Sequence, residues 1–264
     1  MSATTINTPL DASLKELHLP TIRAQYQEEA HRAQQESLSY EQYLLELTQQ
    51  ECQERCQRRM ERNLRASKLP LEKTLASFDL KRLPRKVLQQ VRTLLEGSFL
   101  DRCENCLAFG NPGSGKTHLL CAIGQELIAQ GRRVYFTPCS LLVQDLLAAK
   151  RDLKLSRTIQ RLSKFDAMIL DDLGYVQQSR DEMEVLFTLL AERYERGSVM
   201  ITSNLPFSKW EVIFKDPMTT AAAIDRLVHH SVILELNLKS YRMEAAKKST
   251  QKESKTPRGS GGGT

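Results

Sequence analysis

The stretch Gly110-Asn-Pro-Gly-Ser-Gly-Lys-Thr117 decides the fold of this chain, because it matches the G-x-x-x-x-G-K-[ST] pattern of a phosphate-binding loop in full. Its glycines let successive backbone N–H groups turn toward a phosphate, and the following helix presents its positive end to the same anion. In such a loop Lys116 contacts the β- and γ-phosphates, and the Thr117 hydroxyl binds magnesium (Mg2+). The expected nucleotide contacts are Gly110, Asn111, Pro112, Gly113, Ser114, Gly115, Lys116, Thr117 and His118.

The sequence on either side of the loop predicts the strand and the helix that a phosphate-binding loop joins. The apolar run CLAFG (106–110) precedes it, and THLLCAIGQELIAQ (117–130) follows with helical period and stops at Gly131. Further short apolar runs alternate with helical segments, which predicts a parallel sheet buried by helices on both faces. These runs are RVYFTP (133–138), AMIL (167–170), SVMITS (198–203) and SVILEL (231–236).

Polar residues end two of the predicted strands. Asp171 and Asp172 follow AMIL about fifty residues past the loop, and Asn204 follows SVMITS. Asp171 is expected to hold the magnesium ion, usually through water, and Asp172 to polarise the attacking water. Asn204 is expected to position that water, although it could instead only cap the turn before Pro206.

Two arginines beyond these strands are further candidates. Arg226, in the segment AIDRL (223–227), could project from the end of a helix into the nucleotide of a neighbouring subunit, as an arginine finger does. The Asp225–Arg226 pair by itself is more typical of a surface ion pair. Arg242, just past the last strand, is a lesser candidate for contacting the γ-phosphate.

The composition is that of a globular protein. The chain has 264 residues, of which 41% are hydrophobic and 27% charged. No apolar run approaches the roughly 18 to 20 residues of a membrane span, and the N-terminus lacks the pattern of a secretory signal. The cytoplasm is therefore the expected location. The net charge of +6 lies mostly in residues 239–264, which carry seven basic and two acidic residues, and it suggests a nucleic-acid partner.

Six cysteines in a chain of this kind are expected to be reduced thiols. The pairs Cys52/Cys56 and Cys103/Cys106 also permit a zinc site. Against zinc, Cys106 opens an apolar run, and no nearby histidine completes either pair to the four ligands that zinc requires.

The pattern divides the chain into three parts: a helical N-terminal domain for DNA or partner contact (1–70), a nucleotide-binding core (71–242) and a disordered basic tail (243–264). Ser39 and Gln42 form a predicted capping box at the start of one N-terminal helix.

Two groups of basic residues fall on single helical faces, and we expect them to contact DNA phosphates. A solvated helix face is the alternative for each group. Such contacts would be directed at the DNA backbone and poorly specific for sequence. The groups are Arg55, Arg58, Arg59 and Arg62 in the N-terminal domain, and Arg157, Arg161 and Lys164 between the second and third strands.

With these elements in order, the chain resembles the IstB/DnaC group of AAA+ ATPases over most of residues 70–242. The resemblance is carried by FGNPGSGKTHL (109–119), MILDDLGYV (168–176), MITSNLPFSKW (200–210) and AAIDRLVHH (222–230). It implies an α/β fold, an AAA+ P-loop NTPase with a parallel five-stranded sheet in the order 5-1-4-3-2, preceded by a small all-helical N-terminal domain.

The resemblance also implies a function. Members of this group bind and hydrolyse ATP with magnesium, and they self-associate on duplex DNA. The IstB type helps a cognate transposase to select target DNA in insertion-sequence transposition. Two alternatives stay open: a helicase loader of the DnaC kind, and a small-molecule P-loop kinase. Many AAA+ proteins carry glutamate where this chain has Asp172, whose shorter side chain implies slow turnover.

Overall fold

The computed structural model describes residues 3–174, 179–206, 209–210, 217–238 and 240–241. The chain forms two compact units, Met1–Arg62 and Asn63–Thr264. The division falls within one long helix, whose last turns belong to the second unit. The predicted domain boundary at residue 70 stays a prediction.

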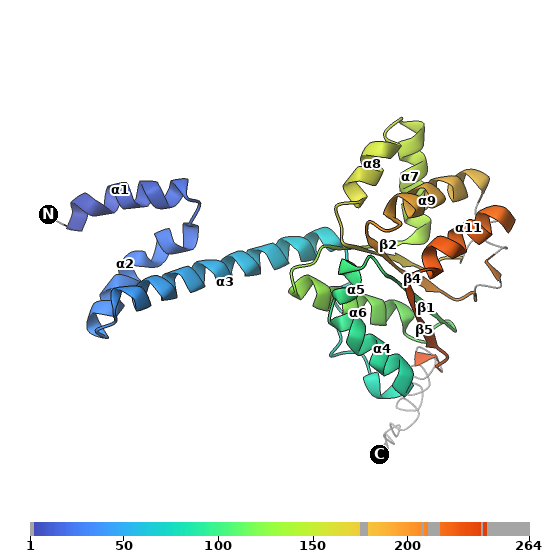
Figure 1. Cartoon of the computed structure of the whole chain (residues 1–264), viewed down its shortest axis with the longest axis horizontal. Helices are drawn as coiled ribbons and strands as arrows, with labels where there is room; N and C mark the ends of the chain where they lie inside the picture. The colour runs from blue at the N-terminus through green and yellow to red at the C-terminus, as the bar shows by residue number, and fades with distance from the viewer. Residues whose placement is uncertain (1–2, 175–178, 207–208, 211–216, 239, 242–264) are drawn as a thin grey trace, which may run out of the picture. The chain divides into compact units, whose positions relative to one another are not determined.

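The N-terminal unit is helical, as its sequence predicts. It contains α1 (Ala3–Glu16), α2 (Pro20–Gln35) and most of α3 (Tyr40–Ser67) (Figure 1). The capping box before α3 is present: the Ser39 amide donates to Gln42 Oε1 at 3.0 Å, and the Gln42 amide donates to Ser39 Oγ at 3.2 Å. Such a box satisfies N–H groups that have no partner within the helix.

A carboxylate from α3 caps the start of α2. The Glu51 side chain is 3% exposed and accepts hydrogen bonds from the amides of Thr21 (2.8 Å) and Ile22 (3.1 Å). Burial raises the pKa of Glu51, but hydrogen bonds from Arg55 and from those two amides outweigh it, so the pKa lies below its usual value. The negative charge thus faces the positive end of α2. The small core beside it contains Leu14, Ile22, Tyr26 and Leu47.

The second unit is built on a five-stranded parallel sheet with the order β2-β3-β4-β1-β5. This is the predicted order 5-1-4-3-2, counted from the other edge. All five apolar runs form strands: β1 (Asn105–Gly110), β2 (Val134–Pro138), β3 (Ala167–Asp171), β4 (Ser198–Ser203) and β5 (Ser231–Leu236). In the centre, Leu107 of β1 pairs with Ile201 and Ile233, and every residue of β4 is buried.

Helices cover both faces of the sheet, which makes three layers (Figure 1). One face carries α7 (Cys139–Arg151), α8 (Leu155–Leu162), α9 (Arg180–Arg193) and α11 (Pro217–Val228). The other carries α4 (Arg85–Leu95), α5 (Ser98–Asp101) and α6 (Lys116–Ala129), with a short 3-10 turn, η1 (Leu80–Arg82), before α4. No helix among the described residues is both long enough and apolar enough to cross a bilayer.

Candidate functional site

The loop between β1 and α6 lies at the carboxyl edge of the sheet, where parallel α/β folds place their ligands. It lines a cavity of about 310 Å³. Gly115 precedes the first residue of α6 with a φ of +95°, a left-handed conformation that favours glycine. A Cβ there would lie 2.9 Å from Cε2 of Phe78. Only glycine therefore suits both the backbone turn and the close packing at this point.

The lysine of the loop is held among oxygen atoms. Lys116 is 5% exposed, and its Nζ donates to Gly110 O at 2.9 Å, Asn111 O at 3.0 Å and Asn204 Oδ1 at 2.7 Å. The loop and the end of β4 thereby meet at one ammonium group. Phosphate oxygens entering the cavity could accept the same donors, since an ammonium group binds phosphate as a compact charge.

A network of short hydrogen bonds joins Thr117 to the two aspartates that follow β3. The hydroxyl of Thr117 donates to Asp171 Oδ1 at 2.7 Å, and the Thr202 hydroxyl donates to the same oxygen at 2.6 Å. The Thr202 hydroxyl in turn accepts from the Asp172 amide at 2.8 Å. A hydroxyl and a carboxylate are oxygen ligands of the kind magnesium takes together with substrate phosphates. The residues present therefore fit a magnesium–nucleotide complex.

Thr202 was missed by sequence reasoning, which treated it only as part of a buried strand. Its hydroxyl touches both aspartates from the neighbouring strand. It holds the backbone of Asp172, whose φ of +56° is uncommon for a residue other than glycine. Asp172 lines the cavity together with Asn204. Both predicted water-contacting residues thus lie in the same cavity as Lys116.

The far wall of the cavity comes from two segments that the sequence left without a role. The connector after α3 contributes Phe78, whose ring meets the His118 ring edge-on at 5.3 Å between centroids. The segment after β5 contributes Tyr241, whose amide donates to Gly113 O at 2.9 Å. The Arg82 guanidinium lies 5.5 Å from the centre of the Tyr241 ring. The lining residues outside the loop and the strand ends are Lys73, Ser77, Phe78, Asp79, Arg82, His118, Leu238 and Tyr241.

This wall mixes aromatic, apolar and charged groups beside the phosphate-binding loop. Cavities for nucleotide-sized ligands have that character, with a few placed polar groups among apolar surface. His118, predicted as a nucleotide contact, has its Nε2 within 3.0 Å of Thr74 O and 3.1 Å of Ser77 Oγ. It thereby fixes the connector against α6 at the edge of the cavity.

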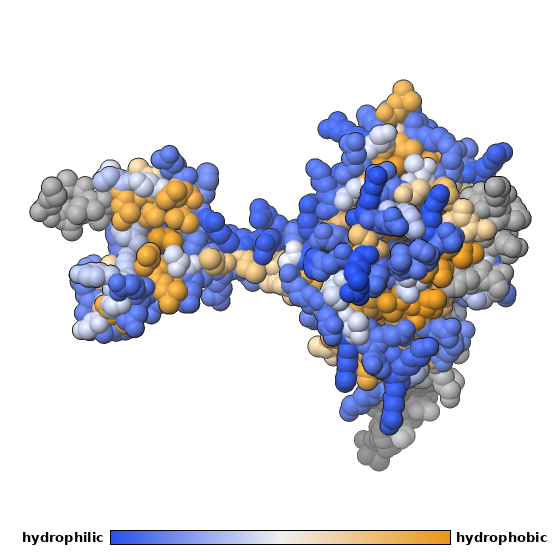
Figure 2. Space-filling model, in the orientation of Figure 1, coloured by the Kyte–Doolittle hydropathy of each residue, from blue (hydrophilic) through white to orange (hydrophobic). Residues whose placement is uncertain are grey.

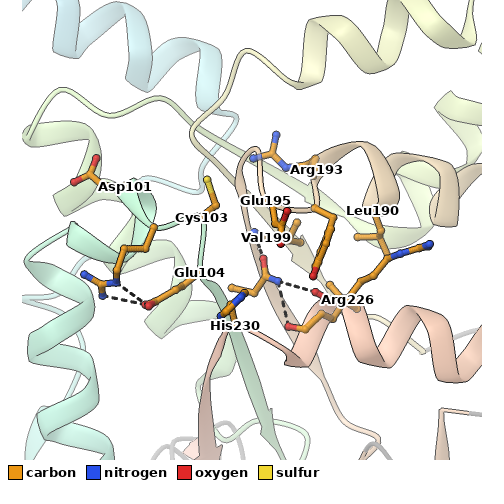
Figure 3. Close-up of a pocket in the computed structure, with 13 residues that line it drawn as sticks. Asp101, Cys103, Glu104, Leu190, Arg193, Glu195, Val199, Arg226 and His230 are labelled. Atoms are coloured by element: carbon orange, nitrogen blue, oxygen red, sulfur yellow. Dashed lines mark hydrogen bonds and ion pairs between the residues drawn. The ribbon is translucent and has the colours of Figure 1, made fainter.

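Arg226 lies away from the predicted nucleotide cavity. It lines a second cavity, of about 530 Å³, near the starts of β1 and β4 and the ends of α9 and α11 (Figure 3). Its backbone carbonyl lies 3.5 Å from Nδ2 of Asn105, the first residue of β1, whereas the phosphate-binding loop starts at Gly110, the last. Five residue steps at ~3.3 Å separate the two by about 16 Å. Arg242 lies outside the described residues.

The two predicted groups of DNA-contacting residues differ in their surroundings. In α3, Arg55 pairs with Glu51 and also donates to His18 O, and Arg58 pairs with Glu54 at 3.5 Å, while Arg59 and Arg62 are exposed.

On and just after α8, Arg157, Arg161 and Lys164 are exposed, and none of them has an ion-pair partner in the described ranges. The helix buries Ile159 and Leu162 on its other side. Figure 2 shows hydrophilic residues interspersed with hydrophobic ones over α7 and α8.

The cysteines of the two predicted pairs differ in exposure. Cys52 and Cys56 are exposed, Cys103 is half-buried and Cys106 is fully buried. Burial raises the pKa of the Cys106 thiol to about 12, which disfavours the thiolate that binds metals. Within the described ranges, no three His, Cys, Asp or Glu side chains are grouped to hold a metal ion.

Comparisons with known sequences identify related proteins along nearly the whole chain. The model of the family described as IstB-like ATP binding protein matches residues 12–249. A protein of Sinorhizobium fredii named as an insertion sequence ATP-binding protein is 45% identical over 238 residues, or 90% of this chain and 80% of the relative. One of the same description from Geobacillus stearothermophilus is 36% identical over 237 residues, or 90% and 94% of the two chains.

Solved structures share the fold at lower sequence identity. The DnaC helicase loader aligns with a TM-score of 0.52 and 18% identity over 62% of this chain and 97% of that chain. The AMPPCP-bound DnaA of Aquifex aeolicus aligns with a TM-score of 0.55 and 21% identity, over 71% and 56% of the two chains. Both likenesses show a shared fold.

Proposed function

Because the chain belongs to the family of IstB-like ATP-binding proteins, we propose that it is a magnesium-dependent ATPase that assembles on duplex DNA and assists a transposase in target selection. The observation that carries the proposal is the meeting of Lys116, Thr117 and Asn204 at one cavity, with Asp171 hydrogen-bonded to the Thr117 hydroxyl. The cytoplasm is the proposed location, because ATP and duplex DNA are both present there.

Different residues of the chain are proposed to contact different parts of the magnesium–ATP complex. N–H groups of the loop at the start of α6 would face the phosphates, and Lys116 would donate to the β- and γ-phosphates in place of the protein oxygens. Thr117 and Asp171 would hold magnesium, which neutralises charge on the same phosphates. Phe78 and Tyr241 line the same cavity and would border the base and ribose.

Asp172 and Asn204 are the proposed water-contacting groups. Both line the cavity, and Asn204 accepts from Lys116, so it lies beside the place where the terminal phosphate would enter. The short Asp172 side chain starts from a backbone whose amide is tied to Thr202. A carboxylate on a short side chain, whose backbone is held in place, suits slow hydrolysis. Slow hydrolysis is what a switch requires.

Hydrolysis is proposed to need a second copy of the chain. Arg226 lies about 16 Å along β1 from the phosphate-binding loop of its own subunit, farther than one side chain spans. An arginine in that place can act on a nucleotide only in a neighbouring subunit. The ATP-bound assembly is then stabilised by contacts between neighbours, and hydrolysis dismantles it.

The DNA and partner assignments rest on charge and on the relatives. The unpaired cations on and after α8 offer a surface for phosphates, and the N-terminal unit (within residues 1–70) and the basic tail (243–264) are proposed to add DNA or partner contacts. The relatives that match about 90% of the chain are named as proteins of insertion sequences, which favours a transposase as partner.

A helicase loader is the second candidate, since DnaC shares the fold. Co-purification separates the two: a transposase encoded beside the gene supports the proposal, and a replicative helicase supports the loader. The small-molecule kinase is separated by ATP turnover measured with and without duplex DNA, because a kinase should ignore the DNA.

Asp172→Asn should trap the proposed assembly. The amide keeps a side chain of similar size but loses the charge that polarises water, while Thr117 and Asp171 are unchanged. We expect electron microscopy to show assemblies on duplex DNA that persist with ATP for the variant and disperse for the wild type. Asp145→Asn, at an exposed position on α7, is the matched control and should disperse. Wild-type turnover by Asp172→Asn, or no assembly of either protein, contradicts the proposal.

The combined change Arg157→Ala, Arg161→Ala and Lys164→Ala should flatten the salt dependence of DNA binding. Each lost phosphate contact should reduce the slope of log K against log salt by about 0.9. The control removes three exposed cations from α4, on the other face of the sheet: Arg85, Lys86 and Arg92. Fluorescence anisotropy on duplex DNA at several salt concentrations measures both. An equal loss of slope in the control shows that general charge, not this surface, binds DNA.

A further inference from the structure

Asn105, the first residue of β1, joins three elements through its side chain. The residue is 8% exposed, and its side-chain Nδ2 donates to Leu227 O at 3.1 Å and to Arg226 O at 3.5 Å. Its Oδ1 accepts from the Val199 amide, at the start of β4, at 2.8 Å. The Asn105 amide donates to His230 O at 2.7 Å. Figure 3 shows the two bonds to the end of α11 in the second cavity.

These bonds fix the end of the helix that carries Arg226. The last carbonyls of a helix lack partners within it and need donors from elsewhere. α11 ends at Val228, so the carbonyls of Arg226 and Leu227 are among them. The side-chain amide of Asn105 supplies donors to both carbonyls and ties the last turn of α11 to the sheet.

The Arg226 side chain packs against an aromatic ring, and one of its guanidinium nitrogens makes no hydrogen bond among the described residues. Its guanidinium lies 4.6 Å from the centre of the Phe187 ring, on α9, as cation–π pairs do. The Nη1 atom is buried and lacks a hydrogen-bond partner within the described ranges. A buried donor without an acceptor is costly in a free subunit. The Arg226 residue also lines the second cavity.

We propose that Asn105 is a positioning residue for hydrolysis: it sets the place of Arg226, which acts on the nucleotide of a neighbouring subunit. This inference rests on the proposed role of Arg226. Asn105 also connects the two strands that lead to the subunit's own nucleotide site. β1 leads to the phosphate-binding loop and β4 leads to Thr202 and Asn204, so the strands that carry a subunit's own site also hold the arginine it donates.

The test uses Asn105→Asp in the full chain. The carboxylate keeps an acceptor for the Val199 amide but cannot donate to the two carbonyls. We expect kcat for ATP hydrolysis on duplex DNA to fall by roughly tenfold to a hundredfold, because a displacement of about 1 Å costs a catalytic group that much. The KM for ATP should change little, since Asn105 lies outside the nucleotide cavity. Asn105→Ser, which retains one uncharged donor, should show a smaller fall.

A matched control removes the same kind of bond elsewhere. Gln90, on α4, donates from Nε2 to Ile233 O of β5 at 3.1 Å. Gln90→Glu should lower the melting temperature about as much as the Asn105 variants but leave kcat near the wild-type value. An equal fall in kcat for Gln90→Glu means that general loosening of the sheet explains the effect and overturns the proposal.

Mixing subunits identifies the step that fails. Asp172→Asn binds ATP and has an intact Arg226, so in large excess it should restore single-turnover hydrolysis in the nucleotide sites of Asn105→Asp subunits. It should restore Arg226→Ala subunits in the same way. If only the Arg226→Ala subunits regain hydrolysis, and the Asn105→Asp subunits do not, the role of Asn105 is overturned and the proposed function stands. Recovery of neither overturns the trans action of Arg226 itself.

Discussion

Lys116→Ala will raise the dissociation constant for magnesium–ATP by roughly a hundredfold or more. The side chain supplies charge-assisted hydrogen bonds to two phosphates, each contributing about 1.5 to 3 kcal/mol, and a loss of about 3 kcal/mol exceeds a hundredfold in affinity. The fold should tolerate the change. The groups that lose the ammonium are Gly110 O, Asn111 O and Asn204 Oδ1, and water that enters the adjoining cavity can replace it.

Titration of a fluorescent ATP analogue, with and without duplex DNA, measures the effect. Lys73→Ala is the matched control, because it removes the same charge from the wall of the same cavity without touching the phosphate-binding loop. We expect that control to bind within a few-fold of the wild type. An affinity of Lys116→Ala equal to that of Lys73→Ala would show that this cavity does not hold the phosphates as proposed.

The sheet could be predicted because each of its strands is a short, nearly continuous apolar run. β4, for example, is buried at every residue, and SVMITS has no position that suits solvent. The phosphate-binding loop could be predicted because its chemistry depends on consecutive residues. In both cases the determining interactions are local in sequence or repeat with a simple period.

The far wall of the cavity could not be predicted in the same way. Phe78 meets the loop from a connector with no periodic pattern, and Tyr241 meets it from beyond β5. Their meeting point is set by the strand order and not by spacing along the chain. Thr202 was hidden for a related reason: a threonine in a buried strand suits packing, and only the β3–β4 pairing brings its hydroxyl to Asp171.

The sequence contains a signal at Asn105 that the prediction did not use: a polar residue at the start of an apolar strand. A polar residue opening an apolar strand requires partners once it is buried. Its partners are main-chain groups of β4 and α11, more than ninety residues away in sequence. Polar residues at the starts of predicted buried strands therefore merit inspection as anchors for distant helix ends.

Arg226→Ala should leave ATP binding intact and reduce hydrolysis by roughly 10³-fold or more, the contribution typical of an arginine finger. The side chain lies outside its own nucleotide cavity, so each isolated subunit should bind ATP as the wild type does. The loss should appear only where a neighbour is present. Wild-type turnover per subunit should accordingly rise with protein concentration as assemblies form, whereas that of the variant should stay flat.

Single-turnover hydrolysis on duplex DNA, measured beside ATP affinity, separates the two effects. Arg102→Ala is the control: Arg102 lines the same second cavity, but its guanidinium is paired with Glu104 at 2.7 Å. Removing it takes away the same charge from the same face and should leave hydrolysis near the wild-type rate. If Arg226→Ala hydrolyses ATP as fast as Arg102→Ala, the charge on the transferring phosphoryl group is stabilised without Arg226. A second copy of the chain is then not needed to supply an arginine. If both variants lose hydrolysis, the face matters for assembly and the guanidinium has no separate part in the reaction.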